Sequence, residues 1–190
     1  NGDSVVEAVD YTLTVEASTS VSEASTTYRF YVNMTDATDR MSDVFGNDEL
    51  NLTINTPEGA FNSESNTNWS AAGINPAFLS FFPDMADDTY ATIGLDGTAT
   101  SSGIVGAMDP AMVQEGEDVI TPYFTTDGAT SLTSVGSSWY VLATAANGLP
   151  NDDMRVLVLQ VTTTGSISGT LNYHVYPLGD GTQDNIVSVS

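Results

Sequence analysis

The stretch Arg155-Val156-Leu157-Val158-Leu159-Gln160-Val161 is apolar on both of the faces that a β-strand would present. Successive side chains of a strand point to opposite sides of its sheet, so a strand that is apolar on both faces is normally covered on both. This stretch therefore predicts a central, buried strand that other parts of the chain must cover.

The next segment, Ser166 to Tyr176, alternates between apolar and polar side chains, which is typical of a half-buried strand. Its inward row is formed by Ile167, Leu171, Tyr173 and Val175. Gly169 stands in the same row, and a glycine inside a strand indicates a bulge or the close approach of another backbone. His174 stands in the opposite row, where we expect an exposed side chain.

Shorter alternating segments occur along the rest of the chain, at residues 9–16, 28–34, 50–54, 91–95, 139–143 and 186–189. Many strands with glycine-rich turns, long loops and at most one short helix are typical of all-β proteins. The sequence therefore predicts an antiparallel β-sandwich of jelly-roll type.

One short segment, Pro76 to Phe82, has the features of a helix. Asn75 would cap it, and Pro76 would occupy its first position. We expect its apolar side chains to form a plug in the core; they are Phe78, Leu79, Phe81 and Phe82.

The chain has 190 residues and no lysine, and three arginines face twenty-five acidic residues, which gives a formal net charge of −22. Binding of nucleic acid and of anionic lipid depends on Lys and Arg, so neither is expected as a partner. The missing lysine also excludes a Schiff base, a P-loop and a Lys–Asn isopeptide crosslink. Arg40 and Arg155 each have carboxylates nearby in sequence, with which we expect them to pair.

Hydrophobic residues make up 41% of the chain, enough for a substantial core, and cysteine is absent. The sequence has no apolar stretch long enough to span a membrane. Charged residues are only 15% of the chain, and its polarity comes from Thr, Ser, Asn and Gly, as in many secreted β-proteins. We expect a mature chain, without its signal segment, that is located outside the cell or on its surface.

We expect two parts along the chain. Residues 1–26 would be an N-terminal strand segment that is exchanged between subunits, and residues 27–190 would form the β-sandwich domain. An exposed strand edge readily accepts a strand from another chain, and the segment from Asn1 to Glu16 is the predicted donor.

Acidic residues form several clusters, and the candidate metal ligands are Asp84, Asp87 and Asp88. Calcium takes six to eight oxygen ligands, which loops rich in Asp and Asn supply. These aspartates follow an apolar segment that would fix their loop, although no EF-hand spacing is present. The alternative is that they belong to a solvated acidic surface. Calcium is the only cofactor that the sequence indicates.

Two long polar stretches, residues 58–73 and 97–117, interrupt the strands, and loops of this length are often functional. Trp69 lies in the first of them. It would serve either as an exposed platform on which a sugar ring stacks or as a buried anchor for its loop.

Catalysis has little support in the sequence. A serine or threonine nucleophile would need a histidine base, and His174 is the chain's only histidine. Two carboxylates would suffice for glycoside hydrolysis, but nothing in the sequence singles out a pair. We therefore predict that the protein is not an enzyme.

Three groups of segments carry a resemblance to a known type of protein. They are Tyr28–Val32 with Asp39–Gly46, Asn75–Phe78 with Phe82–Asp84 and Asp88–Gly94, and Arg155–Thr163 with Ser168–Asn172. Together they resemble a β-sandwich module of uncharacterised secreted surface proteins from marine and other environmental bacteria. The resemblance covers roughly residues 27–176. It implies secretion and a bacterial source, and it supplies no catalytic residues.

These observations predict an extracellular, non-catalytic structural protein that assembles with itself into a filament or surface layer. The alternative is an adhesin or carbohydrate-binding module that depends on calcium and binds glycans through Trp69 and the two long loops.

Overall fold

The computed structural model describes residues 10–183 and 185–190, and within them the chain forms eleven strands. The strands are β1 (Leu13–Thr19), β2 (Thr26–Asn33), β3 (Arg40–Phe45), β4 (Leu52–Ala60), β5 (Tyr90–Ala91), β6 (Ala111–Gln114), β7 (Ala129–Ser134), β8 (Ser137–Tyr140), β9 (Arg155–Thr163), β10 (Ser168–Tyr176) and β11 (Asn185–Val189). In this part of the chain, the only α-helix is α1 (Ile120–Thr125). Every pair of named strands is antiparallel, so the predicted all-β, sandwich-like fold with at most one short helix is confirmed.

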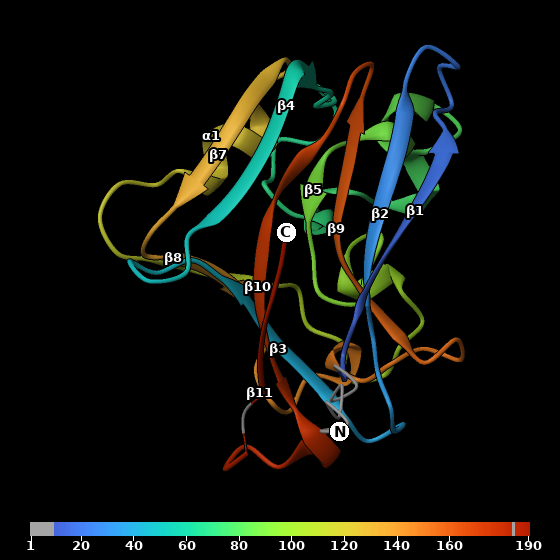
Figure 1. Cartoon of the computed structure of the whole chain (residues 1–190). Coiled ribbons are helices and arrows are strands. Elements are labelled where there is room, and N and C mark those ends of the chain that lie inside the picture. The colour runs from blue at the N-terminus through green and yellow to red at the C-terminus, as the bar shows by residue number, and fades with distance from the viewer. Residues whose placement is uncertain (1–9, 184) are drawn as a thin grey trace, which may run out of the picture.

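The strands follow the order β1-β2-β9-β4-β10-β3-β8-β6, while β5, β7 and β11 pair with β9, β4 and β10. Figure 1 shows β1, β2 and β9 side by side in one part of the molecule and β3, β10 and β11 in another. β4 joins these parts, because Ala60 pairs with Thr163 of β9 and residues 53–55 pair with β10. The sheet therefore spreads apart between β9 and β10.

β9 is the central strand that its sequence predicts. It pairs with β2 on one side and with the short β5 on the other, and all its residues after Arg155 are buried. Val158 packs into the main core, whereas Leu157 packs into a smaller cluster with Tyr31 and Tyr90. Both faces of the strand are covered, as predicted.

β10 also has its predicted inward row, with Leu171, Tyr173 and Val175 all buried. A Cβ on Gly169 would lie 2.0 Å from the Thr53 carbonyl oxygen, so the predicted close backbone approach is confirmed. Asn172 stands in the opposite row, which the alternation predicts to be exposed, yet its side chain is fully buried. Its Nδ2 donates to the carbonyls of Phe45, Leu50 and Asn51, because the loop after β3 covers this face.

Two local predictions are wrong. The segment 91–95 is a strand only at its start, because Gly94 adopts a positive φ of 69° and turns the chain towards Asn147. The helix expected over 76–82 is a single 3-10 turn, Pro76–Phe78, capped by the side chain of Asn75. Its aromatic side chains do not form a core plug, because Phe78, Phe81 and Phe82 are exposed and Leu79 alone packs inward.

β1 lies within the predicted N-terminal segment 1–26, and it pairs along its whole length with β2 of the same chain. Tyr11, two residues before β1, is buried in the core. Its carbonyl oxygen accepts a hydrogen bond of 2.6 Å from the Tyr173 hydroxyl. Residues 1–9 of the predicted donor lie outside the described residues. Exchange of the segment between subunits therefore stays a prediction.

Candidate functional site

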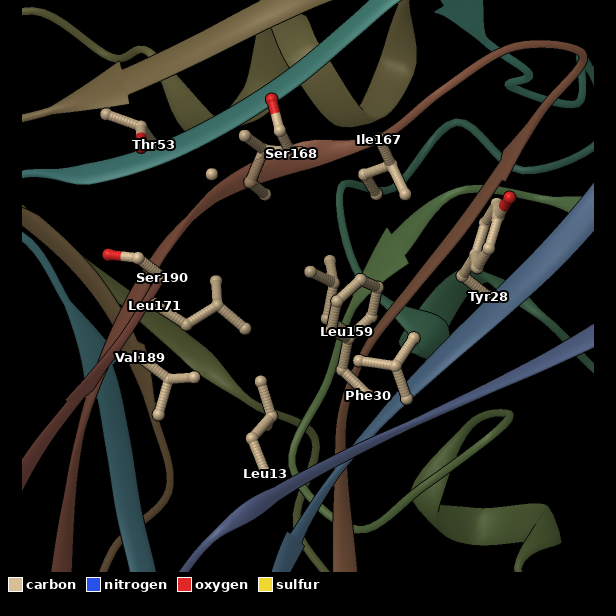
Figure 2. A pocket seen from close by; sticks show the side chains of 13 residues that line it. Leu13, Tyr28, Phe30, Thr53, Leu159, Ile167, Ser168, Leu171, Val189 and Ser190 are labelled. Carbon is tan, nitrogen blue, oxygen red and sulfur yellow. The ribbon is translucent and has the colours of Figure 1, made fainter.

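An apolar groove of about 320 Å³ opens where the sheet spreads apart. Side chains from both parts of the sheet point into it, as Figure 2 shows. We name it the β1–β11 groove after the strands at its two sides. Its walls are Leu13, Val15, Phe30 and Leu159 on one side and Leu171 and Val189 on the other.

The groove follows from the way β9 and β10 diverge. Only residues 164–167 separate these two strands in sequence, and the described residues form no ladder between them. β9 pairs with β2, whereas β10 pairs with β3, β4 and β11. Among the apolar side chains that line this gap, Leu159 and Leu171 are buried, whereas Leu13, Val15 and Val189 on the outer strands are left partly exposed.

Two strand edges border the groove. Within the described residues, β1 pairs only with β2, and β11 pairs only with β10. The N–H of Asn33 donates to the Thr12 carbonyl over 2.8 Å, so Thr12 directs its peptide groups towards β2. Because peptide groups alternate in direction along an antiparallel strand, those of Leu13, Val15 and Ala17 point to the free edge. This edge has the donors and acceptors that another strand would need.

The side chains that line the groove carry no charge. None of the thirteen described residues that line it is acidic or basic, although the chain carries twenty-five carboxylates. Two other hollows of the surface differ, since one contains Glu117 and Asp118 and another contains Asp48 and Glu49. The β1–β11 groove is therefore a place where another acidic chain can approach without meeting carboxylates at close range.

An ion pair holds the β1 wall of the groove. Arg155 Nη1 on β9 donates to Glu16 Oε1 on β1 over 2.6 Å, and this hydrogen bond lowers the pKa of Glu16. The expected local pairs are wrong for both arginines, because Arg155 reaches across β2 and Arg40 donates to the Ala145 carbonyl over 2.7 Å. In each case the pairing of the strands places a partner that is distant in sequence next to the guanidinium group, and the arginine bonds to it and not to its acidic neighbours in sequence.

The three predicted metal ligands lie in one loop but face different partners. Asp87 accepts hydrogen bonds from the backbone N–H groups of Val21 and Ser22, and so fixes the β1–β2 turn. Asp84 accepts a hydrogen bond from the Ser63 hydroxyl. Within residues 10–183 and 185–190, no group of three or more acidic or histidine side chains is arranged to hold a metal ion. Calcium binding here stays a prediction.

Asp88, the third of these residues, is fully buried. Burial raises its pKa to about 7, although hydrogen bonds from the Ser63 N–H and from Asn66 Nδ2 oppose the rise. The nearby Asp84 adds to the rise. Both oxygens of Asp88 already accept hydrogen bonds that tie the 58–73 loop to the segment before β5.

The candidate sugar platform, Trp69, is partly buried and packs against the main core. The structure therefore gives it the contacts of a loop anchor. The exposed aromatic side chains lie a few residues further on, at Phe78, Phe81 and Phe82. Sequence reasoning placed them in the core, although Pro76 and Pro83, one on each side, are a signal for a short surface turn.

His174 is half-buried, not exposed as expected. Its Nδ1 lies 2.9 Å from Asp43 Oδ2 on the neighbouring β3, and its ring packs against Phe45. These contacts join β10 to β3.

The groove was missed at the level of sequence. The alternation in residues 9–16 places Leu13 and Val15 on one apolar face, but it says nothing about which elements cover that face. The link between the segments 155–161 and 166–176 is short enough for a hairpin, so nothing in the sequence indicates that the two strands diverge.

Among the described residues, no helix has the length and apolar character needed to cross a membrane. The chain matches no protein family, no curated protein and no solved structure. The resemblance to a secreted bacterial module therefore stays a prediction.

Proposed function

We propose that this chain is an extracellular, non-catalytic structural protein that assembles with copies of itself into a filament or surface layer. The observation that carries the proposal is the β1–β11 groove, an apolar hollow lined by uncharged side chains, between two strand edges that are free within the described residues, in a chain of net charge −22. Apolar hollows bordered by free edges are sites at which other chains add strands.

The charge of the chain sets the conditions for assembly. Copies that each carry −22 repel one another, and exposed charges are screened beyond about 8 Å at physiological ionic strength. Subunits can therefore pack closely only if salt or divalent cations offset the repulsion. We expect assembly to weaken in low salt and in the presence of a chelator.

A non-catalytic role fits the residues that are present. The chain has no lysine or cysteine to act as a nucleophile, and its single histidine pairs with Asp43 in the β3–β10 ladder. The Thr-, Ser- and Asn-rich composition and the shortage of trypsin cleavage sites, three arginines in all, suit a durable protein outside the cell.

Sedimentation of groove variants tests the proposal. Val15→Glu places a carboxylate at the edge of the groove, whereas Val21→Glu places one on the similarly exposed β1–β2 turn, outside the groove. The wild type and Val21→Glu should sediment as polymers, and Val15→Glu as a monomer with an unchanged circular dichroism spectrum. Equal sedimentation of the two variants would argue against the groove as the assembly surface.

A second candidate function, glycan binding by an adhesin or carbohydrate-binding module, is favoured by the exposed aromatic side chains. Phe78 and Phe82 line a hollow together with Ser65 and Asn75, and none of the described residues that line it is charged. Aromatic faces beside hydroxyl and amide groups can stack on a neutral sugar ring and orient it.

A glycan array separates this candidate from the first. Specific binding that is lost in Phe82→Ala, with the melting temperature unchanged, would support it. Trp69→Ala is the less informative variant, because it removes a packed side chain and is expected to lower stability as well. An array without specific signals would leave self-assembly as the function that the structure supports.

A further inference from the structure

We propose that residues 3–9 of a second copy of this chain occupy the β1–β11 groove as an added strand on the free edge of β1. This inference rests on the proposed function, and it names the partner and the segment. It also narrows the expected donor, Asn1 to Glu16, because β1 begins at Leu13 and is paired within its own chain.

The free edge offers the hydrogen bonds. Leu13, Val15 and Ala17 direct their peptide groups away from β2, as the Asn33–Thr12 hydrogen bond fixes. Two of these residues, Leu13 and Val15, also line the groove. A strand added here would therefore gain main-chain hydrogen bonds and place alternate side chains in the hollow.

The sequence of residues 3–9 has a pattern that suits such a strand. Its even positions, Ser4, Val6 and Ala8, are uncharged and small or branched. Its odd positions hold both carboxylates, Asp3 and Glu7, together with Val5 and Val9. In an extended strand the even row would enter the uncharged groove while the odd row, with both charges, would face water.

The length of the segment matches the edge. Seven residues span about 23 Å as a strand, and β1 itself has seven residues. The hollow that this strand would cover has a volume of about 320 Å³.

The geometry at Thr12 favours a second copy, and not the same chain, as the source of the strand in the groove. A chain that folded back through a two-residue turn at Asp10 and Tyr11 would need the peptide groups of Thr12 for the closing hydrogen bonds. Those groups point to β2, where the Thr12 carbonyl accepts from Asn33. The tightest route back into the same groove is thereby closed.

Engineered cysteines test this directly, because the chain has none of its own. One set of variants carries Ser4→Cys, Val6→Cys or Ala8→Cys, and a separate preparation carries Val15→Cys. Mixed and oxidised under assembly conditions, an even-position variant should form a disulfide-linked dimer with Val15→Cys. The matched control is Val21→Cys, which is similarly exposed but lies outside the groove, and it should form at least tenfold less.

Two outcomes would overturn the inference. One is an equal yield of dimer with Val15→Cys and Val21→Cys. The other is a disulfide within a single chain when Val6→Cys and Val15→Cys are combined and oxidised at high dilution, because that result would assign the groove to the chain's own residues.

A pair of charge variants separates this inference from the proposed function. Val6→Asp puts a carboxylate in the row that enters the groove, and Val5→Asp puts one in the opposite row. Val6→Asp should reduce the polymer mass at least tenfold, and Val5→Asp should not. If both variants assemble like the wild type, the inference fails and the proposed function stands. If the wild type itself never assembles, the proposed function fails too.

Discussion

Arg155 Nη1 lies 2.6 Å from Glu16 Oε1, and the central carbon of the same guanidinium group lies 3.8 Å from the centre of the Tyr31 ring. The arginine thus extends from β9 across β2 and holds β1. Because β1 is an edge strand and a wall of the β1–β11 groove, these contacts help to keep the groove in its observed shape.

Replacing this arginine should loosen β1. In Arg155→Ala the ion pair and the contact with the Tyr31 ring are both lost, and a cation–π contact alone contributes about 0.5–1 kcal/mol. We expect faster hydrogen exchange at the β1 amides that bond to β2. Arg40→Ala is the matched control, since Arg40 Nη1 donates to the Ala145 carbonyl and not to a residue of β1. Equal exchange at β1 in both variants would contradict the assigned role.

Stability at acidic pH should depend on Asp39, which is fully buried. Burial alone would raise its pKa, but hydrogen bonds from the backbone N–H groups of Leu178, Asp36 and Thr35 outweigh burial and lower it. A carboxyl with a lowered folded pKa stabilises the fold above its unfolded pKa of about 3.9, and this contribution is lost as the pH falls through the folded pKa.

Asp39→Asn should therefore be less stable than the wild type near neutral pH, by about 1–3 kcal/mol, and the difference should shrink as the pH falls below about 4. Urea unfolding across this pH range measures the effect. Asp36→Asn is a suitable control, because Asp36 is exposed and its side chain bonds only locally to Thr38. A difference between wild type and Asp39→Asn that does not change with pH would refute the explanation.

Gly169 should tolerate no side chain. A Cβ there would lie 2.0 Å from the Thr53 carbonyl oxygen, and the φ of 152° is one that L-residues rarely adopt. Gly169→Ala should cost about 1–3 kcal/mol in thermal or urea unfolding, because β10 and β4 must separate. Gly181→Ala is the matched control, since no atom of the described residues lies within 4 Å of the place that its methyl group would take, and it should be almost neutral. Similar stabilities of the two variants would show that the approach of β10 to β4 is not as close as described.

The predicted calcium site can be tested at Asp84. Five of the six carboxylate oxygens of Asp84, Asp87 and Asp88 already accept hydrogen bonds from the protein. If calcium binds here, titration of the chelator-treated protein should give a stoichiometric heat signal, and Asp84→Asn should abolish it. The absence of both heat and a shift in melting temperature would remove these residues as a calcium site.

The sequence predicts the main strands well, because burial imposes a pattern on them. The double apolar face of residues 155–161 and the inward row of β10 were both sufficient to place those strands in the core. Prediction from the sequence fails where a neighbouring loop determines whether a side chain is buried. Asn172 has the polarity of a surface residue, yet the loop after β3 covers it and satisfies its amide.

Side-chain hydrophobicity alone misplaced the aromatic residues of the 76–82 segment. Phe78, Phe81 and Phe82 are as apolar as any core residue, but a single 3-10 turn can direct only Leu79 inward. The groove was invisible for a related reason. The residues that line it come from strands far apart in sequence, and the gap between them exists only because β9 and β10 diverge.

Electron microscopy of the wild-type protein at about 0.15 M salt with added divalent cations shows directly whether the chain assembles with itself. We predict regular filaments or sheets, whose reconstruction shows an added strand between the edges of β1 and β11. Dispersed monomers under every salt and cation condition, with the fold intact, would contradict the account.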